Sequence, residues 1–109
     1  MTFNKGDIVK VDLNPIKGHE QGNYRPVLVM NAVPLPSDLS VVLPITSKRK
    51  TYPLEVELDG RTKTQGMILC FQIRTVDLTS RKATFIEKAP ADIVELCNDY
   101  LHRLTDDVM

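Results

Sequence analysis

The spacing of the apolar residues changes at Pro90, and this change divides the chain into two kinds of secondary structure. Before Pro90, "DIVKVDL" and "LEVEL" alternate apolar and polar residues, a period of two that is typical of strands with one buried face. "PVLVM", residues 26–30, is apolar at every position, which predicts a strand covered on both faces. After Pro90 the apolar residues follow a helical period instead. The sequence therefore predicts a mainly β body followed by one helix.

Turn signals separate several short strands in the β part. "LSVVLPI", residues 39–45, is a predicted strand in which Pro44 indicates an edge, a bulge or a strand end. "VPLPSD" before it reads as a turn, and "DG" at 59–60 ends the strand at 54–58. Residues 66–78 form one long predicted strand that bends near Gln72, and "ATFIEK" is a last short one. This pattern favours a small barrel or sandwich.

The predicted helix carries its apolar residues on one stripe. Pro90 fits the first helical position, and the Asp92 carboxylate complements the positive end of the helix dipole. The acidic residues off the stripe predict a solvated face. The stripe consists of Ile93, Leu96, Cys97, Tyr100, Leu101 and Leu104.

Composition restricts the class of protein. A chain of 109 residues with 42% hydrophobic and 26% charged residues predicts one soluble globular domain. No apolar run approaches the ~20 residues of a membrane helix, and "MTFNKGD" lacks a signal peptide's apolar stretch, so a cytoplasmic location and no membrane partner are expected. Cys70 and Cys97, with only two histidines in the chain, suggest buried free thiols and neither disulfides nor a metal site.

Charge is distributed unevenly although the total is zero. Residues 1–88 hold 13 Lys and Arg against 9 Asp and Glu, whereas residues 89–109 hold 1 against 5. A basic body with an acidic tail segment is compatible with nucleic-acid binding on one face. The neutral total gives little long-range steering.

Three polar clusters could carry chemistry. The first, "GHEQGNYRPVLV" at 18–29, is the loop before the fully apolar strand. In its structural reading Gly18 and Gly22 shape the turn, Arg25 pairs with Glu20, and His19 is exposed. In its functional reading Arg25 holds a phosphate through its planar fork, while Glu20 or His19 moves protons, as cleavage of a phosphodiester requires.

The other two clusters follow later strands. "ITSKRKTY", residues 45–52, combines two hydroxyls with three successive basic side chains, either as a solvated hairpin that protects an edge or as a ligand site. In "QIRT", Gln72 and Arg74 lie two apart and would share one face of a strand, either as a structural pair or as ligands. The three clusters could line one groove.

An ordered set of motifs resembles the MazF/PemK family of toxin endoribonucleases from bacterial type II toxin–antitoxin systems. "GDIVKVDLNPIKGHEQGNYRPVLVM" is followed by "LPITS", "YPLEVEL" and "QIRTVD", over roughly residues 5–104. The resemblance implies a small SH3-like barrel of the MazF/PemK/CcdB type at about 5–88, with a C-terminal helix at about 90–104, as a single domain at 1–109.

The resemblance also implies a function and partners. The expected activity is metal-independent, cofactor-free and sequence-selective cleavage of single-stranded RNA, typically messenger RNA. The ribose 2′-hydroxyl would attack the adjacent phosphorus. The expected partners are a second copy of the chain and a cognate antitoxin that lays a flexible segment along the RNA groove, with operator DNA as a partner of the antitoxin complex.

The family's functional residues match individual positions of this sequence. Its Glu-Gln pair, its Arg before Pro and its Thr-Ser match Glu20, Arg25, Thr46 and Ser47, and a histidine found in some members matches His19. The resemblance implies that Glu20, Arg25, Thr46 and His19 are catalytic. It assigns RNA binding to Ser47, Lys48, Gln72 and Arg74, with bracing of the barrel as the alternative for the last two.

Two positions depart from the pattern. Some relatives place an arginine and an acidic residue where this chain has Leu69 and Phe71, which cannot transfer protons. Either Glu20, Arg25 and Thr46 suffice for activity, or activity has been lost. Phe71 is expected in the core, with base stacking as its alternative.

Two other functions stay open at this stage. The same barrel could bind RNA or a peptide without cutting it. It could also act on gyrase, as toxins that share this fold do chiefly through their C-terminal residues; here the distinctive residues lie in the RNA-cleavage motifs instead.

Overall fold

The computed structural model describes residues 2–15, 18, 23–48 and 53–106. Within them, short antiparallel strands precede a single long helix, so the predicted fold class, mainly β with a C-terminal helix, is confirmed. No helix in this part of the chain has the length and apolar character needed to cross a membrane. The elements are β1 (Asp7–Asp12), β2 (Tyr24–Val29), the 3-10 turn η1 (Pro36–Asp38), β3 (Leu39–Thr46), β4 (Glu55–Glu57), β5 (Met67–Leu69), the 3-10 turn η2 (Cys70–Gln72), β6 (Arg74–Asp77), β7 (Thr84–Lys88) and α1 (Ala91–Thr105).

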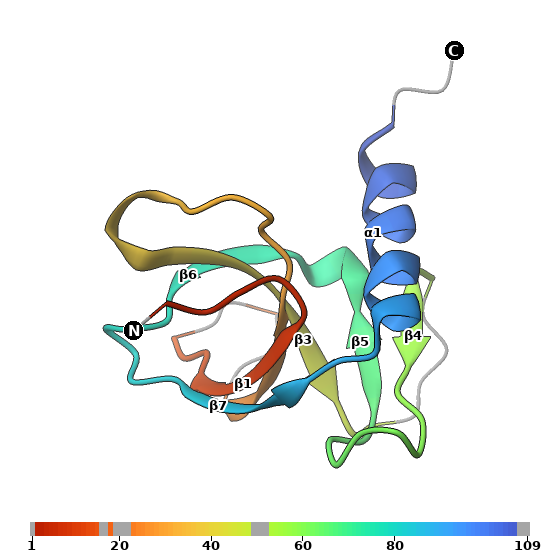
Figure 1. The fold of residues 1–109 in the computed structure, drawn as a ribbon, viewed down its shortest axis with the longest axis horizontal. Coiled ribbons are helices and arrows are strands. Elements are labelled where there is room, and N and C mark those ends of the chain that lie inside the picture. The colour runs from red at the N-terminus through yellow and green to blue at the C-terminus, as the bar shows by residue number, and fades with distance from the viewer. Residues whose placement is uncertain (1, 16–17, 19–22, 49–52, 107–109) are drawn as a thin grey trace.

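The strands form one curved antiparallel sheet in the order β4-β5-β3-β2-β1-β7, and β6 pairs with β3. In Figure 1 β1, β3, β6 and β7 curl around one another, and α1 stands on the side where β4 and β5 lie. β3 pairs with β6 through Leu39–Val42 and with β5 through Ile45 and Thr46. Pro44, which cannot donate a backbone hydrogen bond, lies between these two pairings. The proline therefore marks the point where β3 changes its partner.

The three central strands bury apolar side chains on both faces. Val27, Leu28 and Val29 have no exposed surface, which confirms the prediction for the fully apolar run. One face packs against α1, and the other fills the interior of the barrel. The α1 side contains Ile8, Leu28, Leu43, Ile45, Val56, Ile68, Ile93 and Cys97, and the barrel side contains Phe3, Val9, Val11, Leu13, Val27, Val29, Val42, Val76 and Leu78. Cys70 and Cys97 are both buried free thiols, as expected.

The long strand predicted at 66–78 is two strands separated by a turn. β5 pairs Ile68 with Ile45, and continuing that register would place Phe71 opposite Val42. Arg74 pairs with Val42 instead. The register therefore jumps by three residues, and η2 accommodates them as a 3-10 turn at the predicted bend.

The helix begins one residue later than predicted, and its buried residues lie in its first half. Pro90 is the residue before the helix and not its first position. Ile93 and Cys97 are buried, whereas Leu96 and Leu104 are 40% and 41% exposed. The predicted apolar stripe is thus wider than the surface that the sheet covers.

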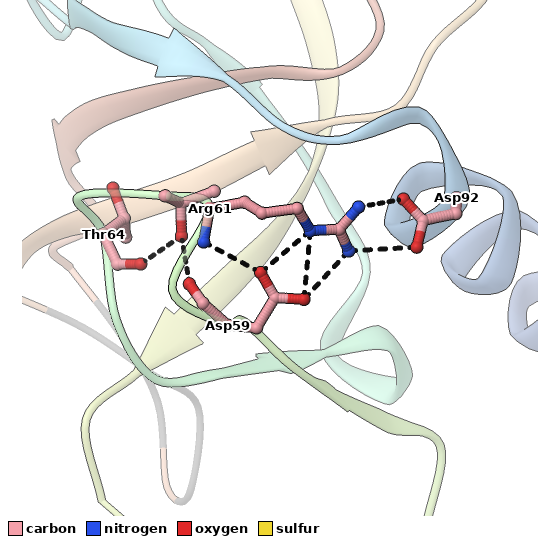
Figure 2. Close-up of polar contacts among 5 residues, drawn as sticks. Asp59, Arg61, Thr64 and Asp92 are labelled. Atoms are coloured by element: carbon pink, nitrogen blue, oxygen red, sulfur yellow. Dashed lines mark hydrogen bonds and ion pairs between the residues drawn. The ribbon is translucent and has the colours of Figure 1, made fainter.

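The connection between β4 and β5 is tied to two distant elements. The Arg61 guanidinium donates to the Asp59 carboxylate and to that of Asp92 in the first turn of α1 (Figure 2). The shortest contact to each carboxylate is 2.8 Å. The Glu87 carboxylate on β7 accepts hydrogen bonds from the Lys63 and Thr64 backbone N–H groups and from the Thr64 hydroxyl. The hydrogen bond from Arg61 lowers the pKa of Asp59 to about 2 and also lowers the pKa of Asp92.

Gly66 lies directly against the end of β3. Its φ is +129°, and an added Cβ would press on the Thr46 carbonyl oxygen and lie 2.9 Å from the carbonyl carbon. Only glycine fits this backbone conformation and this approach without displacing Thr46.

We expect Gly66→Ala to lower the free energy of unfolding by roughly 1–3 kcal/mol, because a side chain adds both backbone strain and a clash. Urea unfolding followed by circular dichroism measures this change. Gly60→Ala is the matched control, since its Cβ would meet nothing within 4 Å, and it should change the value by no more than about 0.5 kcal/mol. Equal unfolding midpoints for the two variants would contradict the close approach.

The stabilisation by Arg61 should depend on pH. A carboxyl whose pKa is depressed in the folded state stabilises the fold above its unfolded pKa, and this stabilisation is lost as the pH falls through the folded pKa. For Asp59 that window runs from 3.8 down to about 2. Wild type should therefore unfold at a higher urea concentration than Arg61→Gln at pH 7. This difference in urea midpoint should become smaller as the pH falls towards 2. A difference that is the same at pH 2.5 and pH 7 would rule out the ion pairs as its cause.

Candidate functional site

Strand pairing brings Arg25 and Thr46 together. The pairing of β2 with β3 ends at Val27 and Pro44, and Arg25 and Thr46 each lie two residues beyond this pair. The Arg25 Nη1 donates to the Ile45 carbonyl oxygen at 3.4 Å, a long hydrogen bond. The guanidinium thus lies beside the backbone that presents Thr46.

The same line of side chains continues across β5 and β4. Thr46 pairs with Met67, and Met67 pairs with Glu57. Directly opposed residues project from the same face of a sheet, and neighbouring strands lie about 4.8 Å apart. Thr46, Met67 and Glu57 therefore form a row across β3, β5 and β4. We call this row, together with Arg25 near its Thr46 end, the site row. It lies on the face away from α1, because the neighbouring Ile45 and Ile68 pack on the α1 side.

Thr46 ends β3 and shapes the turn that follows. Its side chain is buried, and its Oγ1 accepts a hydrogen bond from the Lys48 backbone N–H at 3.2 Å. Ser47 and Lys48 are exposed beside it. The predicted cluster thus places a buried hydroxyl next to two exposed polar residues; its remaining members, 49–52, lie outside the described residues.

The predicted catalytic residues His19 and Glu20 also lie outside the described residues, as does the alternative ion pair between Glu20 and Arg25. Hydrogen bonds join the residues that flank them on either side. The Asn14 Oδ1 accepts a hydrogen bond from the Asn23 backbone N–H at 3.1 Å, and the Leu13 N–H donates to the Asn23 carbonyl oxygen at 3.0 Å. The two chain segments that enter and leave the loop are therefore held side by side.

Two arginines reinforce the entry to this loop. The Arg81 Nη1 donates to the carbonyl oxygens of Asp12 at 2.8 Å and Asn14 at 2.7 Å. The Arg74 Nη1 donates to the Leu13 carbonyl oxygen at 3.3 Å. Arg74 thus braces the barrel, one of its two predicted roles, while its contact with RNA stays a prediction. Sequence patterns did not single out Arg81, Asn14 or Asn23, because their partners are backbone groups of distant segments.

The prediction that Gln72 and Arg74 share one face of a strand is wrong. Gln72 belongs to η2 and Arg74 to β6, because the three-residue register jump falls between β5 and β6. Both side chains are half-buried. A role of Gln72 in RNA binding stays a prediction.

The two departures from the family pattern have different surroundings. Phe71, expected in the core, is only half-buried, whereas Leu69 is fully buried. Leu69 pairs with Glu55, so both project from the face of the site row. The Glu55 Oε2 is buried and has no hydrogen-bond partner among the described residues. The alternation in "LEVEL" places Glu55 and Glu57 on one face, and this signal could have identified both carboxylates from the sequence.

The groups at the Arg25 end of the site row suit a phosphate. Arg25 is half-buried, and this burial lowers the pKa of its guanidinium, which nevertheless stays protonated at neutral pH. A partly dehydrated guanidinium beside a hydroxyl suits a phosphate, because charge-assisted hydrogen bonds are strong there. Among the described residues, no group of three or more His, Cys, Asp and Glu side chains is placed to hold a metal ion.

The sequence is similar to those of a known protein family and of several characterised relatives. Residues 4–105 match the family described as the PemK-like, MazF-like toxin of type II toxin–antitoxin systems. The chain is 37% identical over 107 residues to the endoribonuclease PemK of Escherichia coli, covering 93% of this chain and 78% of that protein. It is 35% identical over 81 residues to the endoribonuclease toxin MazF of Escherichia coli K12, covering 72% of each.

Solved structures agree with these relatives. MazF of Deinococcus radiodurans superposes with a TM-score of 0.89 at 33% identity, covering 95% of this chain and 96% of that one. A MazE–MazF structure from the same organism gives a TM-score of 0.82 at 33% identity with the same coverage. The fold, the order of the sequence motifs and the match over nearly the whole length of the chain all point to the same family. The chain belongs to the PemK/MazF family of toxins of type II toxin–antitoxin systems.

Proposed function

We propose that this chain is a toxin endoribonuclease, one domain that cuts single-stranded RNA, messenger RNA included, at short sequences and without a metal ion. The observation that carries the proposal is the hydrogen bond from the Arg25 guanidinium to the carbonyl of Ile45, the residue directly before Thr46. The relatives PemK and MazF are named endoribonucleases, which supports the reaction class.

The proposed reaction is an internal transesterification. The ribose 2′-oxygen forms a bond to the adjacent phosphorus while the bond from phosphorus to the 5′-oxygen breaks. A base takes the proton of the 2′-hydroxyl, and an acid gives a proton to the leaving 5′-oxygen. The products are a 2′,3′-cyclic phosphate and a free 5′-hydroxyl.

The chain's own residues divide this work. Arg25 holds the phosphate and stabilises the negative charge that grows on its oxygens in the transition state. Thr46 donates its hydroxyl proton to a phosphate oxygen or positions the nucleophile. Glu20 is the proposed general base and His19 the proposed acid or electrostatic helper, both delivered by the loop whose ends Asn14 and Asn23 hold. Ser47 and Lys48, which are exposed next to Thr46, are the proposed contacts to the RNA beside this site.

We also propose the partners of the protein. MazF of Deinococcus radiodurans has been solved together with MazE, and this supports an antitoxin as the partner of this chain. The antitoxin would cover the Arg25 end of the site row with an acidic and apolar segment. A homodimer, binding of operator DNA by the antitoxin complex and a cytoplasmic location complete the proposal.

The first test is cleavage of a long single-stranded RNA in excess EDTA, with the fragment ends mapped. The wild type should make discrete cuts that leave 2′,3′-cyclic phosphates. Arg25→Ala should cut at least about 100-fold more slowly, because the group that stabilises the transition state is lost. Arg103→Ala, on the last turn of α1, is the control and should cut at the wild-type rate.

Circular dichroism of each variant separates lost chemistry from lost folding. Intact RNA with folded wild-type protein would refute the endoribonuclease proposal, and retained RNA affinity would then favour a binding module. Full activity of Arg25→Ala would remove Arg25 from the mechanism.

Thr46 provides a second test through two substitutions of similar size. Thr46→Val removes the hydroxyl and should slow cleavage by about 100-fold, whereas Thr46→Ser keeps it and should stay within about tenfold of wild type. Single-turnover rates at saturating RNA measure both. If Thr46→Val and Thr46→Ser are equally active, the hydroxyl has no part in the reaction.

A further inference from the structure

The connection between β4 and β5 has no apolar side chain of its own. Residues 59–66, "DGRTKTQG", follow the buried Leu58 and precede Met67 of the site row. Only Thr62 among them is buried, and its hydroxyl donates to the Thr64 carbonyl oxygen at 2.6 Å, within the connection itself. Burial of apolar surface therefore does not fix this segment. Between its two strand ends, its position depends on polar contacts to the rest of the molecule.

Two charged side chains, Arg61 of the connection and Glu87 of β7, make these contacts, and we call them the clamp. Arg61 donates to both carboxylate oxygens of Asp92, from Nη1 at 2.8 Å and from Nη2 at 3.0 Å (Figure 2). Glu87 accepts the Lys63 backbone N–H through Oε1 at 3.0 Å and the Thr64 backbone N–H through Oε2 at 2.8 Å. Isolated exposed ion pairs contribute little to stability. These contacts use both oxygens of each carboxylate, however, and so fix direction as well as distance.

The connection in turn lies against the residue that carries the candidate catalytic hydroxyl. An added Cβ on Gly66, the last residue of the connection, would lie 2.9 Å from the Thr46 carbonyl carbon. The next residue, Met67, pairs with Thr46 in the sheet. The Gly66 carbonyl oxygen accepts a hydrogen bond from the Leu58 N–H at 2.9 Å, which joins the two ends of the connection. Because the backbones are in close contact, a shift of the connection displaces the backbone that presents the Thr46 hydroxyl.

The clamp side chains themselves lie away from the hollow beside the site. A cavity of about 310 Å³ next to Ser47 is lined by the connection and by the adjoining ends of β4 and β5. Neither Arg61 nor Glu87 contributes to its lining. The clamp therefore acts on the site through the backbone it holds, and not through its own contact with a ligand there.

We infer that Arg61 and Glu87 are positioning residues for the cleavage reaction. By holding the connection against the end of β3, they keep the Thr46 hydroxyl in place for the phosphate that Arg25 binds. This inference rests on the proposed endoribonuclease function, since it concerns a residue of that same site. Reaction rates are sensitive to placement, and a displacement of about 1 Å can cost about 100-fold. The clamp therefore acts on the chemical step, whereas the affinity for RNA does not depend on it.

The first test separates the chemical step from binding. Arg61→Gln and Glu87→Gln should each lower the single-turnover rate at saturating RNA about tenfold, because the connection is no longer held in one place. The Kd for RNA with a 2′-deoxyribose at the cut site, which has no nucleophile, should stay within about twofold of wild type. Arg103→Gln and Glu95→Gln remove the same charges from exposed positions of α1 and are the matched controls, with wild-type rates expected. Circular dichroism confirms that each variant is folded.

A double-mutant cycle tests whether the clamp acts through Thr46. In the Thr46→Val background the hydroxyl is already absent, so adding Arg61→Gln should lower the rate no more than about twofold. A general weakening of the fold would instead lower the rate by the same factor in both backgrounds. Equal effects of Arg61→Gln in the two backgrounds, or a wild-type rate for Arg61→Gln alone, would overturn the inference.

Hydrogen exchange distinguishes failure of this inference from failure of the proposed function. The Lys48 backbone N–H donates to the Thr46 Oγ1 at 3.2 Å, so its exchange with solvent, followed by NMR, reports on this hydroxyl without RNA. If wild type does not cut RNA but both clamp variants accelerate this exchange about tenfold, the proposed function fails and the positioning of Thr46 stands. If wild type does not cut RNA and the exchange is unchanged in both variants, both proposals are refuted.

Discussion

Burial of both faces of β2 and β3 is the constraint on which the rest of the structure depends. A sheet with two apolar faces needs two covers, and here α1 covers one while the curled strands close over the other. The buried runs at 27–29 in β2 and 42–45 in β3 then have no room for polar side chains, since a buried polar group without a partner is costly. Polar residues are therefore displaced to the strand ends, where Arg25 precedes the apolar part of β2 and Thr46 follows that of β3. Antiparallel pairing brings the start of one strand next to the end of the other.

Local sequence patterns predicted most of the elements because they depend on neighbouring residues. Alternation, an all-apolar run and a change to helical spacing identified the strands and α1, apart from the exact position of Pro90. The long strand at 66–78 was predicted incorrectly, since its interruption arises from pairing with two parts of β3 that no local pattern records. The same holds for the width of the helical stripe, because the exposure of Leu96 depends on how far the sheet extends beneath α1.

The candidate site was predictable as a set of residue types but not as a geometry. The motifs identified Arg25, Thr46 and Ser47, and the pairing of β2 with β3 together with the hydrogen bond from Arg25 to Ile45 explains how Arg25 comes to lie near Thr46. The groups that hold the site were not identified, because Arg61, Glu87 and Arg81 act on distant backbone or carboxylate partners. Gly66 is the clearest example: glycine is common in turns, and only the approach of its backbone to Thr46 explains why a side chain is excluded at this position.

The two ends of the site row differ in charge, and this difference gives the site a direction. Arg25 presents a cation at one end, and Glu57 presents a carboxylate two strands beyond Thr46, about 10 Å away at the usual strand spacing. The proposed reaction places the phosphate at the Arg25 end of the row, where the charges are complementary. The pairing of β3 with β5 and of β5 with β4 sets Thr46, Met67 and Glu57 in line, and none of these residues comes from α1.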